Sequence, residues 1–257
     1  MNSNNPIVTI VTPTFNAEDF IQDTYESIFA QTETNWEWFV IDDGSQDNTV
    51  KIIEKIMVND SRVLLKVQAK NKGAAIARNI GIRESNARFI SFLDADDRWR
   101  PEKLTTQLNI MLQTGAGFTY AAYDIIDLNG NLIGHKKVPR SINYNGLLKH
   151  NVIGCLTAMY DTEVYGKVEM PNICIRQDYG LWLKLLKNGS KAYSVPGTLA
   201  IYRRRPKSLS SNKALAAIGT WHVFRNVENF GFIKSIYYFS FYFTGTILQR
   251  VMWKIGF

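Results

Sequence analysis

Three carboxylates follow directly after an apolar run in the segment FISFLDADDRW, residues 89–99. Asp94, Asp96 and Asp97 lie within four positions, and two like charges about 4 Å apart repel by roughly 4 kcal/mol at an effective dielectric near 20. A Mg²⁺ or Mn²⁺ ion removes this repulsion, because such an ion is held by one or two carboxylates together with the phosphate oxygens of a substrate. A solvated acidic turn, with one aspartate capping a helix that begins near Pro101, explains the same residues about equally well.

A second acidic pair helps to decide between these interpretations. Asp42 and Asp43 follow the apolar segment WFVI and precede Gly44-Ser45. A helix cap needs only one acceptor, so two acidic clusters at the ends of apolar runs favour a hard-cation site over two caps. The segment NKGAAIARN adds Lys72 and Arg78 at a predicted helix start, which suits an anionic ligand. The glycine patterns of dinucleotide-binding and P-loop proteins are absent.

Regular elements have to position these side chains. Four apolar runs predict strands: residues 7–11, 38–41, 63–67 and 88–93. Amphipathic segments between them predict helices: residues 18–30, 47–57 and 72–83. Strands that are apolar throughout and alternate with helices indicate a parallel sheet covered on both faces, with a ligand site beyond the carboxyl ends of the strands. In the second half we expect strands at residues 115–127, near 153–160 and at 199–202, and a helix at 179–186.

Composition limits the class of protein. The chain of 257 residues has a formal net charge of +7 and 46% hydrophobic residues, as expected for a folded protein with an anionic partner. Nucleic acid is a poor candidate for that partner, because an acidic rim repels phosphate unless a metal is present. Cys155 and Cys174 form no metal or disulfide motif, which indicates reduced thiols. The N-terminus lacks the pattern of a signal peptide, so we expect an intracellular protein.

Four motifs in order, VTPTFNAEDFI, FVIDDGSQDNT, NKGAAIARNIGI and FISFLDADDRWRPEKL, resemble those of the inverting family-2 glycosyltransferases. The resemblance implies an α/β glycosyltransferase-A fold: a Rossmann-like, mostly parallel central sheet with flanking helices and a C-terminal helical tail that associates with membranes. It implies that Pro13, Thr14 and Phe15 lie beside the nucleotide, that Asp43 reads the uracil ring and that Lys72 contacts base or phosphate. In the same way it assigns Asp94 and Asp96 to the ribose and to a Mn²⁺ or Mg²⁺ ion, with Asp97 beside them.

The second half resembles bacterial enzymes that build O-antigen and teichuronic acid repeat units, which use a UDP-sugar donor and an acceptor sugar on undecaprenyl diphosphate. The resemblance places the catalytic base at Asp178, with Gln177 where the family usually has Glu. Arg205 stands about where many relatives carry a histidine. Arg203 and Arg205 belong to the run RRRPK, which is either a solvated loop or a diphosphate clamp.

Three regions follow from these patterns: a nucleotide-sugar half at residues 1–105, an acceptor and catalytic-base half at 106–210 and an aromatic, basic helical tail at 211–257. The tail carries no charged residue between Lys234 and Arg250, but its apolar core is short of the roughly 20 residues of a spanning helix. It therefore packs on the domain, packs on a second subunit in a homo-oligomer, or lies in the membrane interface. We favour peripheral attachment to the inner face of the cytoplasmic membrane.

The expected reaction is metal-dependent, inverting transfer of a hexose, glucose or galactose, from a UDP-sugar to a GlcNAc- or GalNAc-diphosphate-lipid. Two alternatives remain: a nucleotidyltransferase that acts on sugar phosphates, and a non-catalytic module that binds sugar nucleotides. The segment PTFNAEDF lacks the glycine-rich basic loop of the first, and Asp178 argues against the second.

Overall fold

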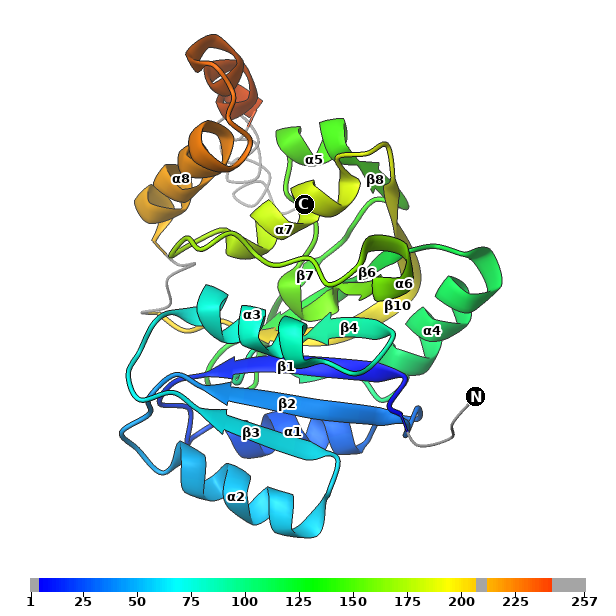
Figure 1. Ribbon diagram of the computed structural model, residues 1–257, viewed down its shortest axis with the longest axis vertical. Helices are drawn as coiled ribbons and strands as arrows, with labels where there is room; N and C mark the ends of the chain where they lie inside the picture. The colour runs from blue at the N-terminus through cyan, green and yellow to red at the C-terminus, as the bar shows by residue number, and fades with distance from the viewer. Residues whose placement is uncertain (1–4, 207–211, 242–257) are drawn as a thin grey trace.

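A single mixed sheet of ten strands forms the centre of the molecule in a computed structural model that describes residues 5–206 and 212–241. The strand order is β3-β2-β1-β4-β9-β6-β10-β5, with β7 paired to β6 and β8 paired to β10 (Figure 1). One hydrophobic core lies on each face of this sheet, and side chains from both halves of the chain contribute to each core.

The first four major strands run parallel: β1 (Val8–Thr14), β2 (Trp36–Asp42), β3 (Val63–Val67) and β4 (Phe89–Phe92). The helices between them are α1 (Ile21–Phe29), α2 (Thr49–Asn59) and α3 (Ala74–Glu84). The predicted alternation is thus confirmed, with ends that differ by a few residues. The strand β3 lies at the sheet edge, and only Val63 of its residues is buried, so the expectation of strands covered on both faces is wrong for β3.

The second half widens the sheet with strands of both directions. Its long strands are β6 (Phe118–Ile126) and β10 (Lys191–Arg203), which pair in parallel. The remaining strands run antiparallel to their neighbours: β5 (Arg98–Trp99), β7 (Leu132–Lys136), β8 (Ser141–Asn143) and β9 (Met159–Asp161). The strand expected at residues 199–202 is therefore much longer. Its register shifts between Ser194 and Thr198, where Pro196-Gly197 interrupts the apolar pattern, and this interruption hides the first part of the strand in the sequence.

The helices of the second half are mostly short: α4 (Lys103–Thr114), α5 (Tyr144–Lys149), α6 (Thr162–Tyr165), α7 (Gln177–Leu186) and α8 (Lys213–His222). A 3-10 turn at Cys155–Thr157 precedes β9, where the sequence predicted one continuous strand. A π-helical turn, Val223–Val227, follows α8, and residues 232–241 are helical again. These last helices stand together at one end of the molecule (Figure 1).

The first two predicted regions share this one sheet, because β9 pairs with β4 of the first region and with β6 of the second. The boundaries at residues 105 and 210 stay predictions. The described part of the tail, residues 212–241, is largely helical, and residues 242–257 lie outside the described residues. Within the described ranges, none of the helices has the length and apolar character needed to cross a bilayer.

Candidate active site

Hydrogen bonds join the strand ends that the sequence predicted to meet on one rim. The Asp43 N–H donates to the Thr14 carbonyl oxygen at 2.8 Å, and the Leu93 N–H donates to the Val11 carbonyl oxygen at 3.2 Å. The three acidic residues after β4 therefore lie beside the ends of β1 and β2. The predicted convergence of these strand ends is thus confirmed, and a ligand site at the carboxyl ends of the parallel strands stays a prediction.

Each carboxylate of the segment Asp94–Asp97 has a different partner. Asp94 forms an ion pair with the guanidinium of Arg78. Asp96 forms an ion pair with Arg205, with 2.6 Å between Oδ2 and Nε. Asp97 is buried, and its Oδ1 accepts a hydrogen bond of 2.9 Å from the backbone N–H of Arg203. Asp97 thus fastens the acidic segment to the end of β10.

The electrostatics of this segment suit a divalent cation. Burial raises the pKa of Asp96, although Arg205 opposes the effect. Burial, and then the charges of Asp96 and Asp94, raise the pKa of Asp97 well above its usual range. An added positive charge would relieve this repulsion, so the oxygen donors fit Mn²⁺ or Mg²⁺. Among the described residues, no three acidic, histidine or cysteine side chains form a metal cluster on their own, so substrate oxygens would have to complete the coordination.

Asp43 shapes the loop before α3. Its Oδ1 accepts hydrogen bonds of 2.8 Å from the Lys72 N–H and from Nε2 of Gln68, and its Oδ2 accepts one of 2.7 Å from the Gly73 N–H. Both oxygens therefore hold the loop backbone, while the Lys72 side chain is exposed. Asp42 instead caps the turn that follows, through the N–H groups of Gly44 and Ser45.

The end of β1 forms the neighbouring wall. Pro13 is half-buried and Phe15 is exposed at the rim. Thr14 is buried, and its hydroxyl has no hydrogen-bond partner within the described ranges. The structure thus brings Pro13, Thr14 and Phe15 to the same rim as Asp43. Their contacts with a nucleotide stay predictions.

All three predicted anion-binding arginines already have protein partners, and they differ in how exposed they are. Arg78 is buried and pairs with Asp94. The Arg203 side chain is only 6% exposed and donates to Oδ2 of Asp23 at 3.0 Å and to the Asp96 carbonyl oxygen at 3.1 Å. Arg205 has a side chain that is 42% exposed. Arg203 therefore supports the acidic segment, and Arg205 is the more accessible of the two for an incoming anion.

Asp178 occupies the first turn of α7 and is half-buried. The helix begins after Arg176, whose φ of 66° lies in the left-handed region that a bulky side chain rarely adopts. This unusual backbone turn sets the direction in which α7 leaves the loop. The positive charge of Arg78 acts on Asp178 as well as on Asp94. No hydrogen-bond donor in the described part of the chain engages the Asp178 carboxylate.

Two further residues lie in the same neighbourhood and carry no motif in the sequence. Cys155 feels the charges of Arg78, Asp94 and Asp178, and burial raises its pKa well above the usual range. Tyr123 lies near Asp97 and Asp178, and burial raises its pKa to about 12. A side chain at Gly154 would place its Cβ 2.7 Å from Cε1 of Tyr123, so glycine makes room for the ring. Only the pairing of β6 with β10 brings Tyr123 to the site.

The chain belongs to the family described as glycosyl transferase family 2, whose model matches residues 9–165. It is 38% identical over 247 residues to the putative teichuronic acid biosynthesis glycosyltransferase TuaG of Bacillus subtilis (strain 168), covering 96% of this chain and 98% of that relative. It is 39% identical over 226 residues to the UDP-Glc:alpha-D-GlcNAc-diphosphoundecaprenol beta-1,3-glucosyltransferase WfgD of Escherichia coli, covering 87% of each chain. The protein is therefore a glycosyltransferase, as the four motifs predicted.

Solved structures show the same fold. The fragment 1–349 of Staphylococcus aureus TarS in complex with UDP-GlcNAc has a TM-score of 0.71 at 19% identity, covering 86% of this chain and 65% of that chain. The mannosyltransferase PcManGT of Pyrobaculum calidifontis in complex with GDP-Man and Mn²⁺ has a TM-score of 0.68 at 16% identity, covering 89% and 66%. These likenesses confirm the glycosyltransferase-A fold.

Proposed function

We propose that the protein is a metal-dependent, inverting hexosyltransferase that transfers glucose or galactose from a UDP-sugar to GlcNAc or GalNAc on undecaprenyl diphosphate. One observation carries this proposal: the acidic segment Asp94–Asp97, the Asp43 loop and an unpaired carboxylate, Asp178, meet on one rim. The names of WfgD, which acts on a GlcNAc-diphosphoundecaprenol acceptor, and of TuaG support a role in O-antigen or related surface-polysaccharide biosynthesis.

The donor side is formed by residues of the first half. The end of β1 and the loop held by Asp43 bind the nucleotide, with Lys72 at the base or the phosphates. Asp94 and Asp96 hold Mn²⁺ or Mg²⁺, and Asp97 fixes the backbone behind them. The bound cation supplies charge neutralisation for the diphosphate of the UDP leaving group. Arg205 already lies at Asp96, so its guanidinium is placed to contact the same diphosphate.

The acceptor side is formed around α7. Asp178 removes the proton from the acceptor hydroxyl, and that hydroxyl attacks the anomeric carbon on the face opposite to UDP, which inverts the configuration. Tyr123 and Cys155 both lie near Asp97 and Asp178. Tyr123 accordingly contacts the acceptor sugar in our proposal. The acceptor is a membrane lipid, so the protein works peripherally at the inner face of the cytoplasmic membrane. A homo-oligomer stays a prediction.

The test is a panel of UDP-sugars with synthetic GlcNAc- and GalNAc-diphosphate-lipid acceptors, each with Mn²⁺ or with a chelator. We expect one donor to give a glycosylated lipid of inverted configuration only when the metal is present. Transfer that is equally fast in the presence of the chelator would refute the proposed metal dependence. A nucleotide-linked product from UTP and a sugar phosphate would point to a nucleotidyltransferase instead. UDP binding with no transfer to any acceptor would favour a binding module.

A further inference from the structure

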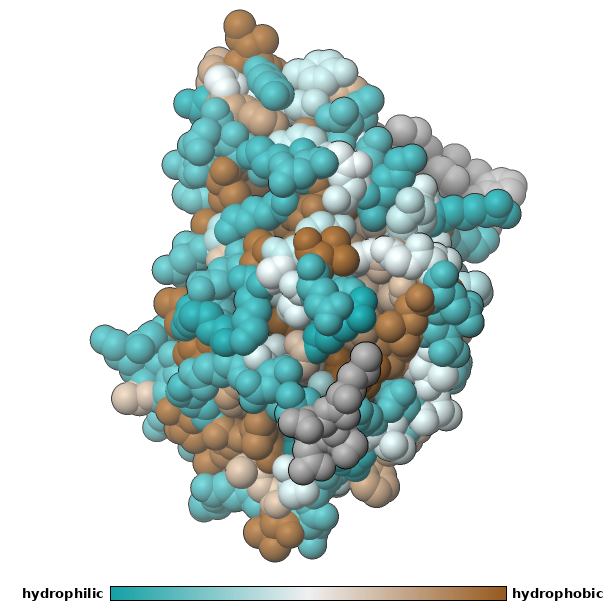
Figure 2. All heavy atoms as spheres, turned by 45° about the vertical axis from the view of Figure 1, so that its right-hand side comes forward, coloured by the Kyte–Doolittle hydropathy of each residue, from teal (hydrophilic) through white to brown (hydrophobic). Residues whose placement is uncertain are grey.

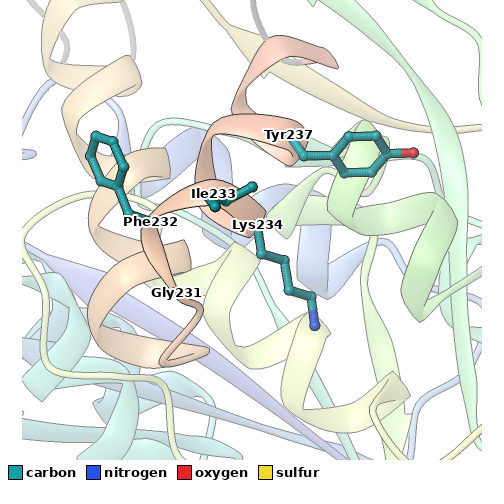
Figure 3. A pocket seen from close by; sticks show the side chains of 5 residues that line it. All are labelled: Gly231, Phe232, Ile233, Lys234 and Tyr237. Carbon is teal, nitrogen blue, oxygen red and sulfur yellow. The ribbon is translucent and has the colours of Figure 1, made fainter.

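An apolar face is exposed on the two C-terminal helices. In the helix at residues 232–241, Ile233 is 84% exposed and Phe232 is 63% exposed, although both are large and apolar. Figure 3 shows Phe232, Ile233 and Tyr237 projecting outward from this helix, with Lys234 beside them. Figure 2 shows brown side chains at the upper tip of the molecule, the end at which these helices stand in Figure 1. Exposed apolar surface of this kind marks an interaction site.

The face continues from one helix to the other. The ring of Trp221, in α8, packs edge-on against the ring of Phe232 with 5.9 Å between centroids. On the same side of α8, at helical spacings of three residues, lie Leu215 and Ile218, both exposed. Ile236 and Tyr237 extend the face along the second helix. We call these residues the docking face: Leu215, Ile218, Phe232, Ile233, Ile236 and Tyr237.

Charge identifies what this face contacts. The described tail, residues 212–241, contains three basic residues, Lys213, Arg225 and Lys234, and one acidic residue, Glu228. Glu228 is buried and forms an ion pair of 2.9 Å with Lys187, so it offers no negative charge to a partner. A second copy of this basic region would be repelled, whereas an anionic bilayer attracts it and accepts the apolar side chains. Aromatic and cationic residues beside an apolar face are the composition of an interfacial segment.

The helix α8, which carries part of the docking face, packs against the loop before α7. We call this loop, which contains Ile175 and Arg176, the catalytic loop. Gly219 of α8 lies so close to that loop that a Cβ there would be 2.5 Å from Cγ2 of Ile175 and 3.2 Å from Cγ of Arg176. Asp178 follows two residues after Arg176. The docking face and the proposed base are therefore connected through the packing of α8 on the loop before α7.

We propose that the docking face inserts its apolar side chains into the interface of an anionic bilayer and thereby presents Asp178 to acceptor head groups. The proposal extends the lipid-linked acceptor of the proposed function. Its test uses vesicles that contain no acceptor, so vesicle binding is measured separately from sugar transfer. The membrane proposal and the proposed function can therefore fail independently.

The experiment compares the full-length protein with two variants in sedimentation with vesicles of phosphatidylcholine, alone or mixed with phosphatidylglycerol. The double variant Phe232→Asp/Ile233→Asp places two charges in the face. The matched control is Val58→Asp, because Val58 is 86% exposed on α2, away from the C-terminal helices. We expect the native protein and Val58→Asp to bind the anionic vesicles alike. The double variant should bind at least about tenfold more weakly, because each buried side chain contributes apolar area.

Several results would overturn the proposal. It would be overturned if the native protein did not bind anionic vesicles, or if the double variant bound them as tightly as the native protein. An equal loss of binding in Val58→Asp would also overturn it. A native dimer that the double variant dissociates, without any change in vesicle binding, would identify the face as a contact between copies. Thermal unfolding and UDP binding of each variant show whether a loss of vesicle binding is a loss of folding.

Discussion

In the proposed mechanism, Asp178 is the residue on which the chemistry depends most directly. Its carboxylate accepts no hydrogen bond in the described part of the chain, and a rigid helix start holds it. Asp178→Asn should lower kcat by roughly 10²–10⁴-fold, because the amide cannot take the proton. UDP affinity in calorimetry should stay within about twofold, because Asp178 lies on the acceptor side of the site.

Glu54→Gln, at an exposed carboxylate of α2, is the control for that substitution and should leave kcat unchanged. Full activity in Asp178→Asn would show that another group accepts the proton.

Tyr123 has a narrower expected effect. Burial raises the pKa of Tyr123 to about 12, so the phenol is neutral and, in the proposed mechanism, donates a hydrogen bond to the acceptor sugar. Tyr123→Phe should raise the acceptor KM about twofold to tenfold, the range of one lost hydrogen bond. Donor hydrolysis without acceptor should be unchanged in Tyr123→Phe. The control Tyr193→Phe, at an exposed tyrosine of β10, should change neither the acceptor KM nor donor hydrolysis. A slower donor hydrolysis in Tyr123→Phe would place the ring on the donor side.

The sequence predicted the site residues that occur in motifs better than the remaining ones. Asp43 and the acidic segment follow strands, so their convergence follows from the parallel sheet. Arg203 and Arg205 look equivalent in the run RRRPK, and only burial and pairing separate the supporting residue from the accessible one. Tyr123 is brought to this neighbourhood by the pairing of β6 with β10, and Cys155 lies in the 3-10 turn before β9; local patterns encode neither contact.

At the scale of elements, α4 carries an unusual core residue. Lys103 is fully buried, its ammonium lies 3.7 Å from the Trp99 ring centroid, and it donates a hydrogen bond to Ser91. Burial lowers the pKa of Lys103 well below 10.5. The unfolded chain therefore binds more protons than the folded chain between these two values, so the free energy of unfolding rises with pH in that window.

Lys103→Met should remove that dependence. At pH values below the lowered pKa of Lys103, the variant should be more stable than the native protein by roughly 1 kcal/mol or more, because no charge has to be buried. The difference should shrink as pH approaches 10.5, the ordinary pKa of lysine. Urea unfolding at several pH values measures this, with Lys55→Met on the exposed side of α2 as the control. If the unfolding free energies of Lys103→Met and the native protein changed with pH in the same way, the explanation would be contradicted.

The contact between α8 and the catalytic loop makes a second prediction for the elements. Gly219→Ala improves helix propensity by about 1 kcal/mol but forces a Cβ into Ile175. We expect the clash to prevail, with a loss of about 1–2 kcal/mol in unfolding free energy and a lower kcat at unchanged UDP affinity. Adding Ile175→Ala should restore kcat in the double variant. No restoration would mean that α8 does not position the base.

The elements themselves were predictable where their periodicity is strong. The alternation from β1 to β4 and the amphipathic α7 appear in the apolar pattern, whereas β5, β7 and β8 are short and polar and have no such signal. Their positions depend on pairing with β6 and β10. The interruption at Pro196-Gly197 similarly concealed the first half of β10.

At the scale of the whole molecule, net positive charge is concentrated in the last third of the chain, whereas the donor side is formed mainly by residues of the first half. An orientation on the membrane follows from this division. The variant Phe232→Asp/Ile233→Asp should transfer sugar to a soluble, short-chain acceptor at the native rate. Transfer to an acceptor embedded in anionic vesicles should fall about tenfold. Equal loss on both acceptors would indicate damage to the site rather than to membrane binding.

The three hydrogen bonds that Asp43 accepts have a consequence for inhibition. They hold the loop before α3, which the proposed function assigns to the nucleotide, in place without a ligand, so a small flat heterocycle that binds there would lose little entropy to loop ordering. Fragment screening should accordingly succeed at this loop sooner than beside α7, where a competitor has to imitate a lipid carrier.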